Sequence, residues 1–302
     1  MRIGVLGMGW VGTSVAISTL HMGVATELLL NDLRAELAEG EALDLAHGAS
    51  FYPAARVRAA GVDELLDTDA VVLAAGRGGK PGQSRLDLLA GNAALARDVG
   101  TRFRNYRGLF VVVTNPVDVL VRLVAESSGL PPARVLGTGT LLDTARLRQV
   151  IGREFRIESR SVHAHVVGEH GDSEVVLWSA ARIGGSPIRG WKGWSADKER
   201  LLATEVRTAA GEIIRRKGAT NHAIGLATAA LLRWMLRDER RVVTVSRVQE
   251  GVAGLKRVAL SLPTIVGRDG AVEVLEPELD GTERDALHRS AGVLEEAYAR
   301  TS

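Results

Sequence analysis

The sequence contains no cysteine, and this absence excludes several kinds of chemistry at once. Without thiols the chain has no disulfide, no thiolate nucleophile and no thiolate metal site, a composition typical of proteins in a reducing cytoplasm. We therefore expect a cytoplasmic protein and predict no metal centre.

The chain also lacks a surplus of charge of either sign. Its 38 basic and 36 acidic side chains leave a formal net charge of +2 on 302 residues. Because binding to a nucleic acid backbone requires a concentrated positive surface, this balance of charge argues against a nucleic acid partner.

Fixed charges are missing from one N-terminal segment, residues 3–26. A signal peptide or a membrane span can have this composition. Glycines occupy positions 4, 7, 9 and 12, however, where a spanning helix would carry aliphatic side chains. We predict that this segment neither targets the chain nor crosses a membrane, and that the protein has no membrane partner.

Hydrophobic residues are 46% of the chain, enough for a sizeable core. In the first half, short aliphatic runs alternate with longer amphipathic segments, a pattern typical of right-handed βαβ units and of a parallel sheet covered on both faces. We expect a doubly wound α/β domain with strands within residues 2–7, 26–32, 57–61, 70–76 and 108–116, and helices up to residue 22, at 33–46 and at 87–105.

The pattern changes after residue 138, where helical segments and two strand-like runs replace the alternation. We place a domain boundary there, with domains at 1–138 and 139–302, and expect the second domain to be α+β. The expected elements are a helix after residue 139, helices at 196–217 and 222–237, strands at 240–248 and 256–267, and a final helix capped by Thr282.

The segment RIGVLGMGWVG places Gly7, Gly9 and Gly12 directly after a strand and at the start of a helix. In this GxGxxG arrangement the first glycine allows a tight turn, the second admits a pyrophosphate and the third packs helix on strand. Asp32 follows the next strand, where a carboxylate accepts hydrogen bonds from a ribose diol and repels a 2'-phosphate. We predict NAD as cofactor, against the alternatives of an ordinary glycine turn and a solvated Asp32.

Asp143 and Arg146 lie three residues apart in GTGTLLDTAR, on one face of the expected helix. Alone they would be a surface ion pair of little energetic value. His170, in VVGEHGDSE, lies next to a glycine after an apolar run, a poor place for a core histidine. If Asp143 accepts a hydrogen bond from one ring nitrogen, the other nitrogen is left to exchange a proton with a substrate.

Five motifs together resemble the lactate/malate dehydrogenase family, most closely its L-lactate dehydrogenases, with some similarity to L-2-hydroxyisocaproate dehydrogenase. The likeness extends over nearly the whole chain through KGAT (217–220) and LSLPTIVG (260–267). The motifs are GMGWVG, KPGQSRLDL, VVVTNPVD, GTGTLLDTAR and GEHGDSE, in this order.

The resemblance implies a Rossmann NAD-binding domain followed by an α+β catalytic domain, and it implies a role for each matching residue. His170 would be the acid/base, Asp143 its carboxylate partner, and Arg146 the bidentate ligand of the substrate carboxylate. Arg85 would polarise the substrate C2 oxygen, and Asn115 would bind near nicotinamide and substrate. Ala209, Ala210 and Thr220 match positions that line the substrate pocket.

Arg85 ends the glycine-rich segment RGGKPGQSR (77–85), which leaves the expected strand at 70–76. Such a segment can act as a lid that carries the arginine from water to the reacting oxygen, where its charge has a larger effect. The alternative is a surface loop whose basic residues have no role.

Gly79 matches the position that discriminates substrates in the family, typically glutamine in lactate dehydrogenases and arginine in malate dehydrogenases. Glycine offers room rather than a contact, so the preferred side chain stays open between a methyl group and a bulkier apolar group. A dicarboxylate also stays open if Arg77 or Lys80 reaches it.

Two further residues match an anion site for fructose 1,6-bisphosphate found in some bacterial lactate dehydrogenases: Arg148 and His163. Relatives without this control carry the same residue types, so the alternatives are activation by this sugar phosphate and the absence of such control. The likeness also implies a homodimer or homotetramer.

The predicted activity is that of an NAD-dependent L-2-hydroxy acid dehydrogenase, with lactate and pyruvate as the leading pair and malate or bulkier acids as alternatives. NAD-dependent glycoside hydrolases share the cofactor fold but rely on a metal held partly by cysteine, which this chain lacks. A protein that binds NAD without catalysis should have lost Arg85, Asp143, Arg146 or His170, and all four are present.

Overall fold

A computed structural model describes residues 1–76 and 85–301 of the chain. Gly79 therefore lies outside the described residues. Arg85 is the first residue of a helix, and its side chain also lies outside what is described.

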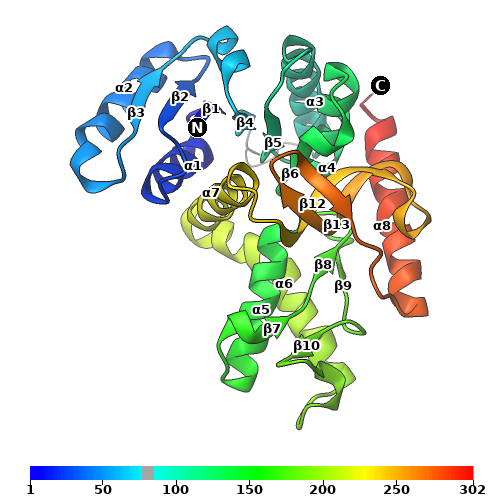
Figure 1. The fold of residues 1–302 in the computed structure, drawn as a ribbon. Helices are drawn as coiled ribbons and strands as arrows, with labels where there is room; N and C mark the ends of the chain where they lie inside the picture. Colours follow the sequence, from blue (N-terminus) through cyan, green and yellow to red (C-terminus); the bar gives the residue numbers. More distant parts are fainter. Residues whose placement is uncertain (77–84, 302) are drawn as a thin grey trace.

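A nine-stranded sheet forms the centre of the protein, in the order β14-β13-β12-β6-β5-β4-β1-β2-β3 (Figure 1). Its parallel half has the order β3-β2-β1-β4-β5-β6. Successive strands are added toward one edge of the sheet from β1 to β3 and toward the other edge from β4 to β6, while all six strands stay parallel. This is the doubly wound arrangement predicted from the alternation, and it creates a crevice at the carboxyl ends of β1 and β4. The parallel strands are β1 (Arg2–Leu6), β2 (Glu27–Asn31), β3 (Arg56–Ala59), β4 (Ala70–Leu73), β5 (Leu109–Val112) and β6 (Val135–Gly137).

Helices cover both faces of this parallel sheet. The expected helices are present, and α7 from the second half of the chain packs beside α1. The helices around the sheet are α1 (Trp10–His21), α2 (Ala35–His47), α3 (Arg85–Arg102), α4 (Val117–Ser128), α7 (His222–Leu236) and α8 (Gly281–Ala299).

The two strand-like runs of the second half are strands, but they do not form a separate sheet. They continue the parallel sheet in antiparallel fashion, because β12 pairs with β6 through Ser246 and Gly137. The two halves of the chain therefore share one sheet. The added strands are β12 (Arg241–Glu250), β13 (Lys256–Gly267) and β14 (Gly270–Val274).

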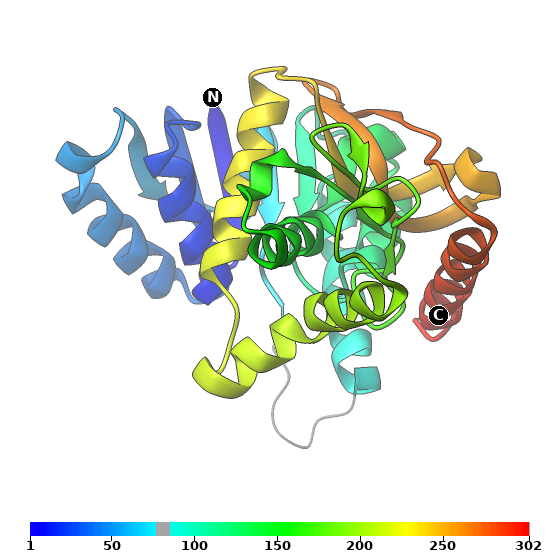
Figure 2. The same ribbon diagram turned by 90° about the horizontal axis from the view of Figure 1, so that it is seen from below.

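A smaller lobe lies below the sheet in the view of Figure 1, and Figure 2 shows it from below. Helices α2 and α8 lie at opposite ends of the molecule, on either side of this lobe. It has its own core, in which Leu147 and Ile151 pack with Val162, Ile183 and Leu202. Its elements are α5 (Leu141–Phe155), α6 (Ala196–Lys217), β7 (Val162–His163), β8 (Val166–Val167), β9 (Val175–Val176), β10 (Arg182–Ile183) and β11 (Ser186–Pro187).

Helix α8 begins earlier than predicted, and the expectation of a Thr282 cap was wrong. Asp280 is the cap: its Oδ1 accepts from the amide of Glu283, and the Glu283 carboxylate accepts from the amide of Asp280. This reciprocal pair satisfies two amides, which one hydroxyl cannot do. Short 3-10 turns span Ala49–Phe51, Val62–Asp67, Pro132–Arg134, Ser159–Ser161, Ile188–Gly190 and Val252–Gly254.

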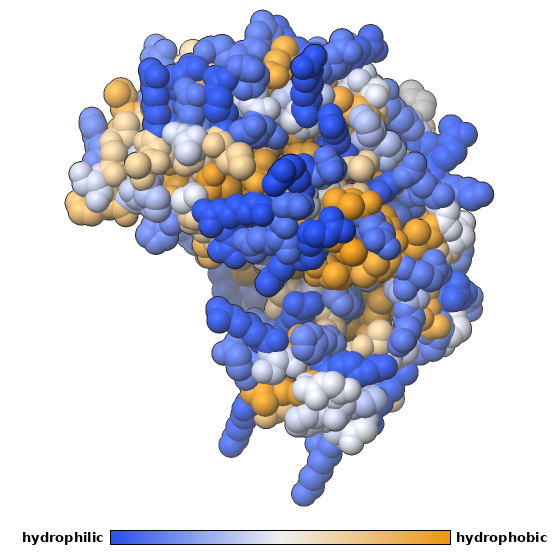
Figure 3. All heavy atoms as spheres, viewed as in Figure 1, coloured by the Kyte–Doolittle hydropathy of each residue, from blue (hydrophilic) through white to orange (hydrophobic). Residues whose placement is uncertain are grey.

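The face of the molecule in Figure 3 is mostly hydrophilic, with hydrophobic residues exposed in patches. Within the part of the chain that the structure describes, none of the helices has the length and apolar character needed to cross a membrane.

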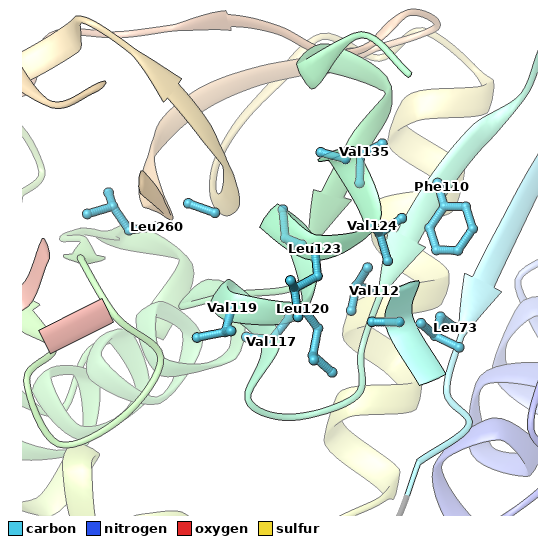
Figure 4. Close-up of a cluster of buried hydrophobic side chains, with 14 of the residues drawn as sticks. Leu73, Phe110, Val112, Val117, Val119, Leu120, Leu123, Val124, Val135 and Leu260 are labelled. Carbon is cyan, nitrogen blue, oxygen red and sulfur yellow. The ribbon is translucent and has the colours of Figure 1, made fainter. Parts of the chain in front are cut away.

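Alternate strand residues bury on opposite faces of the sheet. Leu73, Phe110 and Val112 pack against α4, with Leu120 and Val124 among the contacting side chains (Figure 4). The intervening strand residues belong to a second cluster that α1 and α7 cover: Ile3, Val5, Leu28, Leu30, Val72 and Val111. This alternation fixes the register of β1, β4 and β5, and with it the positions of the loops at their carboxyl ends.

Candidate active site

The segment with Gly7, Gly9 and Gly12, here called the glycine loop, lies at the carboxyl end of β1, at the point where the strand order reverses. Gly7 has a φ of +94°, and a Cβ on it would lie 2.4 Å from the backbone of Ala75. A Cβ on Gly12 would lie 1.8 Å from the carbonyl oxygen of Gly7, whereas one on Gly9 would have no atom within 4 Å. The fold therefore requires Gly7 and Gly12, while Gly9 leaves open space over the start of α1.

Asp32 follows β2 and turns back to this loop. Its Oδ2 accepts from the amide of Met8 at 2.8 Å, and its Oδ1 accepts from the amide of Arg34 at 3.0 Å. Burial raises the pKa of Asp32, but these two hydrogen bonds and the Arg34 charge outweigh it and hold the pKa below its usual value. An ionised carboxylate beside an open glycine loop fits the ribose and pyrophosphate of NAD and disfavours a 2'-phosphate.

A cavity of about 680 Å³ opens next to the glycine loop. Sequence reasoning did not find its far wall, because Lys217, Asn221 and His222 come from the α6–α7 turn in the second half of the chain. Trp10 and Ile17 of α1 form the near wall. Both halves of the chain therefore border the cavity beside the glycine loop.

The predicted trio of Asp143, Arg146 and His170 comes together in the structure. His170 Nδ1 lies 2.6 Å from Asp143 Oδ2, and Arg146 donates through Nη1 to Asp143 Oδ1 at 2.7 Å. The side chain of Asp143 is only 3% exposed. The Asp143–Arg146 pair is therefore not the solvated surface pair that the spacing alone allowed, and Asp143 orients both cations.

Charge and burial set the protonation of His170. Burial lowers its pKa, but the negative charge of Asp143 and its hydrogen bond outweigh this and raise the pKa to about 9. Burial raises the pKa of Asp143, and His170 and Arg146 together bring it below its usual value. At neutral pH the pair is therefore an imidazolium beside a carboxylate, with Nε2 left to deliver a proton.

A second carboxylate holds the main chain of His170. Asp118, in the first turn of α4, accepts from the amide of His170 at 2.8 Å and is 2% exposed. Burial raises the pKa of Asp118 to about 6, opposed by its hydrogen bonding and by the charge of His170. Asp118 stands in the motif VVVTNPVD, but nothing in its spacing indicates a partner 52 residues away.

Helix α8 fixes the residues on either side of His170. Ser290 accepts from the amide of Glu169 at 2.9 Å, and the hydroxyl of Ser173 lies 3.0 Å from that of Ser290. Gly168 has a φ of +84° and exchanges backbone hydrogen bonds with Ser261 of β13. The segment 168–174 between β8 and β9, here called the histidine loop, is therefore anchored by α4, α8 and β13.

The remaining predicted residues lie around this centre. Asn115 follows β5 near the crevice and is exposed; its Oδ1 accepts from the amide of Val117 at 3.2 Å. Thr220 is half-buried on the turn between α6 and α7, and Ala209 and Ala210 are half-buried on α6.

The two residues of the predicted anion site belong to a larger basic cluster. Burial, then the charge of Arg241, lowers the pKa of Arg148. Burial, followed by the charges of Arg148 and His163, lowers the pKa of the neighbouring His165 to about 4. Sequence reasoning missed Arg241, which is the first residue of β12, and His165, which lies between β7 and β8.

Comparison with known proteins agrees with the fold and with the site. Residues 1–137 match the NAD-binding domain of lactate/malate dehydrogenase, and residues 140–301 match the alpha/beta C-terminal domain of that family. An L-lactate dehydrogenase from Geobacillus kaustophilus is 42% identical over 306 residues, covering 99% of this chain and 96% of its own. One from Kosmotoga olearia is 41% identical over 308 residues, covering 98% and 95%.

Solved structures give the same result. The minor L-lactate dehydrogenase from Enterococcus mundtii, in its ligand-bound form, superposes with a TM-score of 0.96 at 38% identity, covering 100% of this chain and 98% of its own. The chain is a member of the lactate/malate dehydrogenase family, and its N-terminal half is the NAD-binding domain of that family.

Proposed function

We propose that this protein is an NAD-dependent L-lactate dehydrogenase, in which residues 1–138 hold the cofactor and residues 139–302 supply the acid/base pair. The observation that carries the proposal is the 2.6 Å contact between His170 Nδ1 and the buried Asp143, with Arg146 on the same carboxylate. The relatives named above, all L-lactate dehydrogenases, favour lactate over the other 2-hydroxy acids.

The cofactor would be held by the glycine loop and its neighbours. Gly9 leaves room for the pyrophosphate at the start of α1, Asp32 accepts from the ribose, and Asn115 lies at the nicotinamide end. When bound, the nicotinamide supplies the hydride acceptor or donor for C2 of the substrate.

The chain's own residues move the proton and bind the acid. His170 gives a proton from Nε2 to the substrate oxygen during reduction and takes it back during oxidation, while Asp143 fixes the tautomer. Arg146 binds the substrate carboxylate, and Arg85 stabilises negative charge on the reacting oxygen. Thr220 lines the substrate pocket.

The substrate side chain would meet Gly79, which offers no contact of its own. Pocket size then enforces the preference for a methyl group. Malate and bulkier 2-hydroxy acids are the alternatives that this glycine leaves.

Initial rates of NADH oxidation with pyruvate, oxaloacetate, 2-oxoisocaproate and phenylpyruvate test the proposal. We expect the highest kcat/KM with pyruvate, because the relatives that align with nearly the whole chain are named L-lactate dehydrogenases. A preference for oxaloacetate would replace lactate by malate, and no oxidation of NADH with any of the four acids would overturn the dehydrogenase itself.

We also propose that the protein is a homodimer or homotetramer. Large apolar side chains are exposed on helices that frame the nucleotide-binding half: Trp10 and Ile17 on α1, Leu43 on α2, and Leu226 on α7 are each more than half exposed. A second copy of the chain would cover them. Native mass in solution distinguishes these states from a monomer.

Activation by fructose 1,6-bisphosphate is a further part of the proposal. The charge of Arg241 lowers the pKa of Arg148, and a phosphate bound between Arg148 and His163 would offset this repulsion. The rates with pyruvate are therefore to be measured with and without the sugar phosphate. A cytoplasmic location remains a prediction that rests on the absence of cysteine.

A further inference from the structure

Glu174 is a buried acidic residue that the mechanism above does not use. It stands four residues after His170 and directly before β9, and it is 5% exposed. Its Oε1 is closed off from solvent and has no hydrogen-bond partner among the described residues. A buried carboxyl oxygen without a partner is uncommon in native proteins and calls for an explanation.

The surroundings of Glu174 are those of the candidate active site. The charged groups that act on it are Asp143 and Arg146 from α5, His170 from its own loop, and Arg207 from α6. In the part of the chain that the structure describes, neither arginine forms an ion pair with Glu174. Two further acids share the loop: Glu169, which accepts from Ser173, and Asp172.

Burial without a partner favours the uncharged form of this side chain. Removing a carboxylate from water without a hydrogen bond or an ion pair is strongly unfavourable, so such a group keeps its proton instead. The nearby carboxylate of Asp143 acts in the same direction. Burial first, then the charge of Asp143, raises the pKa of Glu174 to about 8, although His170, Arg207 and Arg146 oppose the rise.

We propose that Glu174 sets the net charge of the substrate site, and that it is held as an uncharged carboxylic acid while the substrate anion binds. This inference rests on the proposed function. With Glu174 uncharged, the cations Arg146 and His170 exceed the charge of Asp143, and the site attracts an anion. Once Glu174 is ionised, its charge offsets that attraction.

The sign of the effect separates Glu174 from His170. Pyruvate binding requires the protonated form of His170 and lactate binding the neutral form, so the titration of His170 changes the two affinities in opposite directions. Ionisation of Glu174 repels both anions and weakens both affinities. A change of the same sign for pyruvate and L-lactate is therefore the signature of Glu174.

The experiment compares KM for pyruvate and for L-lactate at pH 6.5 and pH 9 in the wild type, Glu174→Gln and the control Glu273→Gln. Glu273 is an exposed residue of β14, outside the site. At pH 9 we expect Glu174→Gln to have a KM about fivefold lower than the wild type for both acids, because a buried charge is incompletely screened. At pH 6.5 the three proteins should agree within about twofold, since Glu174 then carries its proton in the wild type.

Two further measurements test the same inference. The dissociation constant of oxamate, an analogue of pyruvate that accepts no hydride, should follow the same pattern in the enzyme with NADH bound. Between pH 7.5 and pH 9 the KM for L-lactate should fall less in the wild type than in Glu174→Gln, because ionisation of Glu174 opposes the fall that His170 produces.

Three results would overturn the inference. The first is a pair of opposite changes for pyruvate and lactate in Glu174→Gln, which would mean that Glu174 acts through His170. The second is no change at pH 9, and the third is an equal fall of the KM for lactate with pH in the wild type and in Glu174→Gln. Absence of turnover with any 2-oxo acid would instead overturn the proposed function, and this inference with it.

Discussion

At the scale of single residues, the candidate site is a small number of buried charges with few partners. Asp143 serves His170 and Arg146 at once, because it lies on one face of α5 with Arg146 and opposite the histidine loop. The sequence predicts this trio, since a histidine next to a glycine after an apolar run is unsuited to a core. Asp118 and Glu174 could not be predicted, because their roles depend on burial against segments far away in the chain.

Asp118 provides a prediction at this scale. Its negative charge is one of the contributions that raise the pKa of His170, and it also holds the main-chain amide of His170. We expect Asp118→Asn to move the alkaline fall in kcat/KM for pyruvate reduction from about pH 9 to lower pH, by about half a unit or more. The direction follows because pyruvate reduction needs the imidazolium, and the variant stabilises it less.

The pH profile of kcat/KM between pH 6 and 10 measures this shift. Asp98→Asn, an exposed aspartate of α3, is the matched control and should leave the profile in place. An unchanged profile in Asp118→Asn, together with a lower melting temperature, would reduce Asp118 to a purely structural residue.

At the scale of elements, hydrophobic periodicity predicted the α-helices other than α4 and the strands β1–β5, β12 and β13, because buried strands and amphipathic helices must repeat with fixed periods. It did not predict α4 or the strands β6–β11 and β14. The end of an element was less predictable. The cap of α8 is Asp280 rather than Thr282, since the decisive partner is the side chain of Glu283. The pairing of β12 with β6 was also beyond the sequence, because one bridge between Ser246 and Gly137 joins the halves of the sheet.

The turn from β1 into α1 provides a prediction at this scale. Gly9 and Gly12 look alike in the sequence, but a Cβ on Gly9 meets nothing within 4 Å whereas one on Gly12 meets a carbonyl oxygen at 1.8 Å. We expect Gly9→Ala to fold with a free energy of unfolding within about 0.5 kcal/mol of the wild type and to bind NADH at least about tenfold more weakly. Gly12→Ala should lose about 2 kcal/mol or more of stability.

Chemical denaturation and NADH titration of both variants measure these effects. Equal losses of stability in the two variants would show that both glycines are structural. Normal NADH binding by Gly9→Ala would show that the pyrophosphate does not occupy the space above Gly9.

At the scale of the whole molecule, the continuous sheet places the glycine loop and the histidine loop on one body. The first comes from β1 and the second from the segment between β8 and β9, which α4, α8 and β13 anchor. The doubly wound arrangement of the first half followed from the alternation of strand-like and helical runs. How the second half closes the site did not, because it depends on tertiary contacts such as that between Asp118 and His170.

The central claim, that His170 is the acid/base of a 2-oxo acid reductase, is tested most directly by the turnover of His170→Ala with pyruvate and NADH. We expect kcat to fall by about 10² to 10⁴ while NADH binding is retained, because proton transfer is lost and the glycine loop is untouched. His288→Ala, at an exposed histidine of α8, should keep wild-type turnover. Near-normal turnover of His170→Ala would contradict the account.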